Sequence, residues 1–192
     1  QPNTLIFTGS FRYRPNFDAM VWFIEEVLPR IQAKVPDVTI TITGHSADLL
    51  LPYNPAVLQT GFVEDVRPLI ARSWISVAPL LAGGGTRFKI LEAFATGTPV
   101  VATSKGAEGL IGPTNRYMLI ADDPNDFASK VIQLLADCDL RDQLSQQGRK
   151  LVEEQYEWKV ILPTFLNVVK LTGTVRQANS KQFPSTRQEL GS

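Results

Sequence analysis

The chain has 192 residues, of which 44% are hydrophobic, and its 19 basic and 19 acidic side chains leave no net charge. A chain of this length suits one domain with a substantial core. Balanced charge argues against the broad basic surface with which proteins attract nucleic acid or anionic lipid. We therefore expect no nucleic-acid partner, and a charged ligand would have to be recognised locally.

The chain contains one cysteine, Cys138, and one histidine, His45. A single cysteine excludes an internal disulfide, and these two residues form no cluster with zinc-ligand spacing. No apolar run approaches the roughly 18 residues that span a bilayer, and no cationic and then apolar leader opens the chain. The sequence thus predicts no metal site, no transmembrane segment and a cytoplasmic protein. A strand close to Gln1 indicates a piece of a longer protein, for which peripheral attachment to a membrane is left open.

Strand and helix patterns alternate along the chain. Short apolar or β-branched runs predict the strands, and apolar residues at helical spacing predict the helices between them. Asn16 is a suitable N-cap for a helix that Pro29 kinks or divides, and Asp123 with Pro124 opens another. The expected strands lie at residues 4–8, 38–43, 74–78, 99–102 and 117–121, with a weaker one leading to 61–63, and the expected helices cover 17–31 and 65–71, begin at 124, run through 140–151 and begin at 158.

Strands that alternate with crossover helices indicate a parallel sheet that is covered on both faces. The predicted fold class is α/β: a doubly wound parallel sheet in a Rossmann-like single domain over residues 1–172. Residues 173–192 are polar and lack periodicity. They predict a mobile tail, or a segment that packs on another domain.

A short helix between Thr86, a suitable N-cap, and Gly97, a suitable left-handed residue after its end, carries Arg87 and Lys89 in its first turn. The helix dipole already places about half a positive charge there, so each cation costs about 0.3–1 kcal/mol. With the N–H groups of the three glycines at 83–85, these cations form a site for an anion such as phosphate. In the alternative, Lys89 pairs with a glutamate three residues on and Arg87 lies in solvent.

Gly9, Gly44, Gly61 and the glycines at 83–85 each stand just past a predicted strand. The carboxyl ends of parallel strands meet at one edge of the sheet, where doubly wound folds bind their ligands. Four glycine positions at this edge therefore support a binding site there. The Gly-x-Gly-x-x-Gly fingerprint and the Walker A spacing are both absent, which disfavours a nicotinamide or flavin cofactor.

Residues 78–103 resemble the donor-site signature of glycosyltransferases of the glycosyltransferase 1 group, most specifically in the part Glu-Ala-x-Ala-x-Gly-x-Pro-Val-Val that begins at Glu92. The resemblance continues at 7–10, 15–19, 61–66 and 106–110 and covers most of residues 4–171. These enzymes are retaining transferases with two facing Rossmann-like domains, the GT-B architecture. The resemblance implies that the chain is the C-terminal, donor-binding half, which binds a nucleotide diphosphate sugar without a metal or other cofactor. The acceptor would bind to the missing N-terminal domain, so we expect little transferase activity from this chain alone.

The family motif also implies roles for single residues. Glu92 matches the glutamate that accepts hydrogen bonds from the ribose, whereas the glutamate that contacts the donor sugar falls on Gly84, where a backbone N–H of the loop would take over part of its role. The family's phosphate-binding Arg and Lys fall on Ser10 and Pro15, and nearby arginines would substitute. The predicted catalytic residues, which stabilise the diphosphate leaving group, are Arg87 and Lys89, and the predicted donor-binding residues are Gly9, Ser10, Arg12, Arg14, Gly44, His45, Phe62, Val63, Gly83, Gly84, Gly85, Thr86 and Glu92.

Simpler interpretations stay open for several of these residues. A loop histidine such as His45 is more often solvent-exposed than a ligand, and Phe62 with Val63 would ordinarily be core. Two other function classes also fit a domain of this kind. One is a GT-B-fold sugar-nucleotide epimerase, and the other is a noncatalytic nucleotide- or phosphate-binding module.

Overall fold

The computed structural model describes residues 2–46, 48–110, 112 and 114–169. These residues belong to two compact units, residues 1–153 and residues 154–192, which are considered separately. The predicted tail at 173–192 lies outside the described residues.

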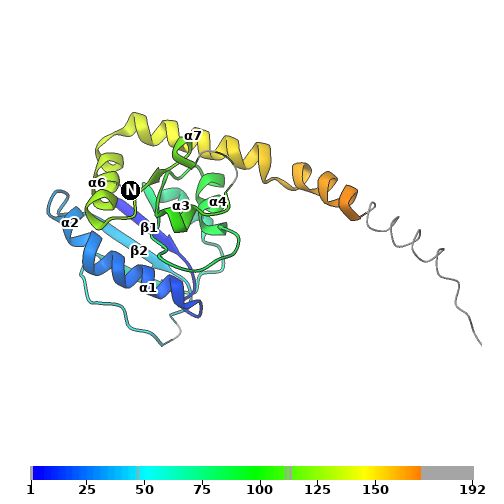
Figure 1. Cartoon of the computed structure of the whole chain (residues 1–192). Helices are drawn as coiled ribbons and strands as arrows, with labels where there is room; N and C mark the ends of the chain where they lie inside the picture. Colours follow the sequence, from blue (N-terminus) through cyan, green and yellow to red (C-terminus); the bar gives the residue numbers. More distant parts are fainter. Residues whose placement is uncertain (1, 47, 111, 113, 170–192) are drawn as a thin grey trace, which may run out of the picture. The chain divides into compact units, whose positions relative to one another are not determined.

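The first unit is built on a six-stranded sheet in which every pairing is parallel (Figure 1). The strands are β1 (Thr4–Thr8), β2 (Thr39–Thr43), β3 (Val57–Gly61), β4 (Ile75–Ala78), β5 (Val100–Ala102) and β6 (Leu119–Ile120). Their spatial order, β3-β2-β1-β4-β5-β6, is that of a doubly wound dinucleotide-binding fold. The predicted doubly wound, Rossmann-like α/β fold is thereby confirmed. The strand order reverses between β1 and β4: β2 and β3 are added on one side of β1, and β5 and β6 on the far side of β4. The carboxyl ends of β1 and β4 therefore leave a crevice between them.

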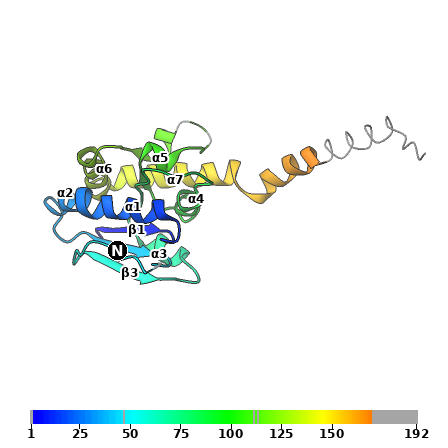
Figure 2. The ribbon, with the colours of Figure 1, turned by 60° about the horizontal axis from the view of Figure 1, so that its bottom comes forward.

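Helices cover both faces of this sheet. A continuous segment of α1 (Arg14–Trp22), a π-helical turn (Phe23–Val27) and α2 (Leu28–Gln32) lies beside α6 (Pro124–Ala136) on one side of β1 and β3 (Figure 2). Right-handed crossovers that leave β1 and β4 in opposite directions place α1 and α4 (Phe88–Ala95) on opposite faces. The remaining helical elements are α3 (Arg67–Arg72), α5 (Ser104–Ala107), a 3₁₀ turn (Thr114–Arg116) and α7 (Cys138–Gln155).

Isoleucine and threonine alternate in β2, and this alternation decides which side chains of the strand join the hydrophobic core. Ile40 and Ile42 join the main hydrophobic cluster with Leu5 and Phe7 of β1, while the three threonines of β2 alternate with them. This arrangement follows from the two-residue period of a strand, which sends neighbouring side chains to opposite faces. The cluster extends through the helices of the α1 face, where Phe127 makes edge-on contacts with aromatic rings of the helical segment.

Helix ends differ from the sequence predictions at two places. The N-cap prediction for Asn16 is wrong, because α1 begins at Arg14 and the Asn16 side chain bonds elsewhere. The N-cap prediction for Thr86 is also wrong, because Arg87 occupies the N-cap position of α4, which begins at Phe88, and no side chain caps the helix. The predicted division near Pro29 is confirmed as the π-helical turn before α2.

Other predicted boundaries are confirmed. Asp123 caps α6 by accepting hydrogen bonds from the backbone N–H groups of Asn125 and Asp126. Gly97 takes a positive φ of 74° just after α4. The helix expected through 140–151 is α7. In the second unit, residues 158–169 are helical, as predicted, and expose apolar side chains three and four residues apart: Trp158, Ile161, Leu162, Phe165, Leu166 and Val169.

Gly148 marks the closest approach of α7 to α4. A Cβ atom at this position would lie 2.5 Å from Cδ1 of the Phe94 ring. We predict that Gly148→Ala lowers the free energy of unfolding by up to about 2 kcal/mol, because an overpacking cost of about 1–3 kcal/mol outweighs the gain of about 1 kcal/mol in helix propensity. Urea denaturation measures the change, and Gln146→Ala at an exposed position of the same helix is the control. A more stable Gly148→Ala protein would show that the two helices separate freely.

Candidate functional site

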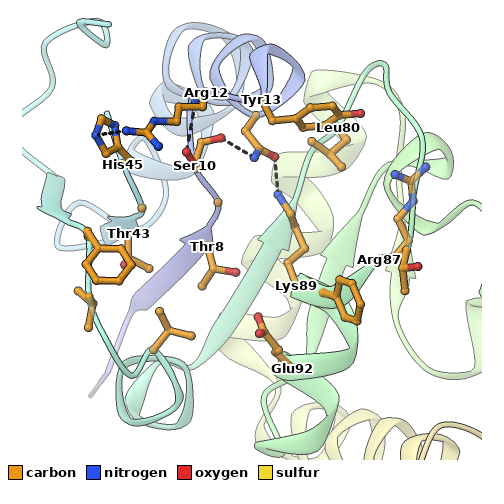
Figure 3. Close-up of a pocket in the computed structure, with 18 of the residues that line it drawn as sticks. Thr8, Ser10, Arg12, Tyr13, Thr43, His45, Leu80, Arg87, Lys89 and Glu92 are labelled. Atoms are coloured by element: carbon orange, nitrogen blue, oxygen red, sulfur yellow. Dashed lines mark hydrogen bonds between the residues drawn. The ribbon is translucent and has the colours of Figure 1, made fainter. Parts of the chain in front are cut away.

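A cavity of about 720 Å³ lies at the carboxyl edge of the sheet, where β1, β2 and β4 end and α4 begins (Figure 3). This cavity is the crevice between β1 and β4, where the strand order reverses. Twelve of the predicted site residues line it: Gly9, Ser10, Arg12, Gly44, His45, Phe62, Val63, Gly84, Thr86, Arg87, Lys89 and Glu92. Three predicted residues do not, namely Arg14, Gly83 and Gly85. Residues that the sequence did not predict to bind the donor also line it: Thr8, Tyr13, Asn16, Thr43, Val66, Leu80 and Phe88.

The floor of the cavity is made by closely apposed strand ends. The N–H of Gly9 donates to the carbonyl of Thr43 (2.9 Å), and the N–H of Gly44 donates to the carbonyl of Gly61 (2.9 Å). Gly44 has a φ of 134°, and a Cβ atom there would overlap the carbonyl of Gly9. Glycine is therefore required at this position by both its conformation and the close approach of the two chains.

Lys89 is the central polar group of the cavity. Its Nζ donates to Oδ1 of Asn16 (2.8 Å) and lies 4.0 Å from the centre of the Phe7 ring. Lys89 forms no ion pair among the described residues, so the alternative of a pair with Glu92 is not realised. Desolvation, the positive charge of Arg87 and the opposing charge of Glu92, in that order of importance, set its pKa, which falls from 10.5 to about 7.

Asn16 is oriented for this contact by a second bond. Its Nδ2 donates to the carbonyl of Ser10 (2.8 Å), which leaves Oδ1 to accept from Lys89. Asn16 is buried, and a Cβ atom on Gly9 would lie 2.7 Å from its Nδ2. The turn after β1 therefore fixes the position of the lysine on α4.

Glu92 lies one turn after Lys89 on α4, on the cavity side of the helix (Figure 3). Partial desolvation raises the pKa of its carboxyl, and the charge of Lys89 opposes that shift. The carboxylate can accept hydrogen bonds from a ligand hydroxyl.

Arg87 is directed away from Lys89 (Figure 3). Its side chain is 4% exposed, and it donates to the carbonyls of Lys105 (2.8 Å) and Glu108 (3.1 Å) and to the Glu108 carboxylate (3.3 Å). Lys105 also pairs with Glu108 at 2.6 Å, and this contact is the main reason that the pKa of the Glu108 carboxyl is lowered. The alternative in which Arg87 lies in solvent is therefore wrong. The Arg87 side chain instead bonds the start of α4 to the segment after β5.

The arginines after β1 point in different directions. The guanidinium of Arg12 lies 3.1 Å from Nε2 of His45, and both side chains are exposed on the cavity wall. Arg14 instead pairs with Asp18 (2.8 Å) and stacks on Phe17, outside the cavity.

Tyr13 connects the turn after β1 with the glycines at 83–85. Its hydroxyl donates to the carbonyl of Gly84 (3.3 Å) and accepts from the N–H of Gly84 (3.0 Å). A backbone N–H of the loop was expected to contact the donor sugar, and that of Gly84 is bonded to the protein itself. Tyr13 follows the first strand of a doubly wound sheet, and that position was the one sequence signal that could have identified it.

The described residues contain no group of three or more His, Cys, Asp or Glu side chains that could hold a metal ion. Within the same part of the chain, no helix combines the length and the apolar character that crossing a bilayer requires.

Comparison with known proteins gives a consistent result. A family model described as glycosyl transferases group 1 matches residues 2–137. An uncharacterized glycosyltransferase of Methanocaldococcus jannaschii is 27% identical over 179 residues, which are 87% of this chain and 44% of that protein. The lipopolysaccharide core biosynthesis glycosyltransferase LpsE of Rhizobium meliloti is 28% identical over 152 residues, which are 71% of this chain and 43% of that protein. The chain thus spans less than half the length of these curated relatives.

Solved structures share the fold. Sucrose-phosphate synthase from Thermosynechococcus elongatus superposes with a TM-score of 0.72 at 18% identity, over 91% of this chain and 46% of that one. Anabaena HepE in complex with UDP-glucose gives a TM-score of 0.72 at 14% identity, over 88% of this chain and 49% of that one.

The lowered pKa of Lys89 predicts a specific dependence of stability on pH. Between pH 7 and 10.5 the unfolded chain binds a proton at Lys89 that the folded chain does not, so folding becomes more favourable as the pH rises. Relative to Lys89→Met, the wild type should gain up to about 1.4 kcal/mol per pH unit in this window. Urea denaturation at pH 7, 8 and 9 measures the difference. Lys34→Met at an exposed position is the control, and a wild-type-to-variant difference that stays constant with pH would contradict the desolvation of Lys89.

Proposed function

Because the chain belongs to the glycosyl transferases group 1 family, we propose that it is the donor-binding part of an enzyme that moves a sugar from a nucleotide diphosphate sugar to an acceptor. Retention of the anomeric configuration and independence from metal ions are parts of this proposal. The single cysteine supports a reducing, cytoplasmic compartment for the enzyme.

The observation that carries the proposal is the Lys89 ammonium group. It is desolvated, yet its hydrogen-bond partner, Asn16, is neutral. Taking a charge out of water costs several kcal/mol unless an ion pair compensates it; Glu92 opposes the shift of Lys89 without forming an ion pair, and a bound anion would offset the remaining cost. A diphosphate in the crevice between β1 and β4 would meet this cation at the edge where doubly wound folds bind their ligands. The HepE structures in complex with UDP and with UDP-glucose support a ligand of this class.

We assign roles to the cavity residues on this basis. Lys89 would neutralise the diphosphate and stabilise the negative charge that develops on it as the sugar leaves, which is commonly a large part of catalysis. Glu92 would accept hydrogen bonds from the ribose. Phe62 and Val63 also line the cavity, and their apolar side chains suit contact with a base. Arg87 would contribute mainly as a fixed positive charge, since its Nε and Nη2 are engaged by the segment at 105–108.

The acceptor would bind to a part of the protein that this chain lacks, since the curated relatives are more than twice as long as the matched region. The apolar stripe on helix 158–169 supports a packing surface for that part. We therefore expect the 192-residue chain to bind the donor without transferring its sugar.

A binding screen tests the proposal. Titration calorimetry of the chain with uridine, guanosine and adenosine diphosphates and their glucose conjugates should identify at least one ligand with micromolar to millimolar affinity. The conjugate should not be converted into an epimer, because the proposed activity is transfer. Absence of binding by every compound would contradict donor recognition, and epimerisation of the conjugate would favour the second enzyme class.

The same titration identifies the role of Lys89. Lys89→Met keeps the aliphatic stem but removes the charge, and should weaken diphosphate binding about tenfold or more, as expected for a charge-assisted bond. Wild-type affinity should also fall from pH 7 to pH 9, because the free ammonium loses its proton with a pKa of about 7. Lys34→Met should bind like the wild type. An unchanged affinity in Lys89→Met would show that the anion binds elsewhere.

A further inference from the structure

The glycine loop, defined as residues 81–85, is held by few hydrogen bonds in the described part of the chain. In the described part of the chain, the hydrogen bonds of its backbone both go to one side chain, Tyr13, which lies 71 residues before Gly84. The Tyr13 hydroxyl bonds with both polar backbone groups of Gly84. Both hydrogen bonds that join the loop backbone to the rest of the described chain thus share a single phenolic oxygen.

Packing at Gly83 agrees with this dependence. A Cβ atom there would overlap the Tyr13 hydroxyl and lie 3.3 Å from Cβ of Pro15. At Gly84 and Gly85, in contrast, an added Cβ atom would meet nothing within 4 Å. Gly83 and Gly85 have φ values of 98° and 97°, which favour glycine. The loop is therefore in close contact at one point and open at the next two residues.

The backbone of Tyr13 is itself held by hydrogen bonds within the turn after β1. It precedes α1, its N–H donates to the carbonyl of Ser10, and its carbonyl accepts from the N–H of Asn16. Asn16 is also the residue that holds Lys89. One short turn after β1 thus positions both the cation of the cavity and the glycine loop beside it.

We propose that Tyr13 is a positioning residue of the donor site, whose hydroxyl holds the glycine loop so that Gly84 and Thr86 line the cavity next to Lys89. The identity of the ligand rests on the proposed function, whereas the tie itself is a feature of the free protein. Tyr13 acts through the loop. Breaking the tie leaves Lys89 and Asn16 in place but allows the loop to leave the cavity wall.

The test is the Tyr13→Phe substitution, which keeps the ring and removes the two hydrogen bonds. Hydrogen–deuterium exchange of the free protein should become faster in the peptide that covers residues 82–87, because the N–H of Gly84 loses its acceptor. Calorimetric titration with uridine diphosphate should show an affinity lowered about three- to tenfold, the effect of one or two ordinary hydrogen bonds. The thermal midpoint should stay near that of the wild type.

Two further variants sharpen the result. Tyr53→Phe, at a side chain that is 93% exposed and outside the cavity, should change neither exchange nor affinity. Gly83→Ala should speed exchange at 82–87 and lower the affinity at least as much as Tyr13→Phe, because its Cβ atom displaces the Tyr13 hydroxyl and alanine is also strained at a φ of 98°.

The outcomes separate this inference from the proposed function. Unchanged exchange at 82–87 in Tyr13→Phe would overturn the tie, and faster exchange with wild-type affinity would overturn its role in positioning. Either result leaves the proposed function intact if the wild type binds uridine diphosphate. If the wild type binds none, the donor role of Tyr13 fails together with the use of this ligand by the cavity.

Discussion

The bond between the Lys89 ammonium and the Asn16 carboxamide is the interaction on which the site depends. It places a cation, 2.8 Å from a neutral acceptor and 4.0 Å from an aromatic ring, at the point where the sheet reverses its winding. Desolvation at this place disfavours the charged form. A group held in this way weakens the folded protein at neutral pH, and a diphosphate ligand would recover that energy on binding.

The surrounding structure keeps this cation in position. Gly9 and Gly44 allow the ends of β1 and β2 to approach closely, which brings the following turn over the cavity. The turn supplies Asn16 to the lysine and Tyr13 to the glycine loop. On the other side, Arg87 fixes the start of α4 to residues 105–108 and adds a positive charge that lowers the pKa of Lys89 further. Stability and ligand recognition therefore rely on the same short segments.

The sheet and most helices could be predicted from the sequence, because strand alternation, helical periodicity and glycines after strands are local signals. Lys89 could also be identified, since a cation in the first turn of a helix conflicts with the dipole. The bonds of Arg87 and Tyr13 could not, because their partners lie 18 to 71 residues away and become neighbours only when β1, β4 and β5 align. In the sequence, Arg14 looked equivalent to Arg12 as a phosphate-binding residue. The helix begins at Arg14, however, and places Asp18 one turn away, so the Arg14 side chain pairs with Asp18 outside the cavity.

Proton uptake on ligand binding tests the central claim most directly. Titration of uridine diphosphate in two buffers with different ionisation enthalpies counts the protons that the protein gains. If Lys89 binds the diphosphate, uptake near pH 8 should approach about one proton and should decline toward pH 6, where the ammonium is already charged. The same uptake should persist in His45→Gln, which excludes the imidazole as the source. Binding at pH 8 without proton uptake would contradict the account.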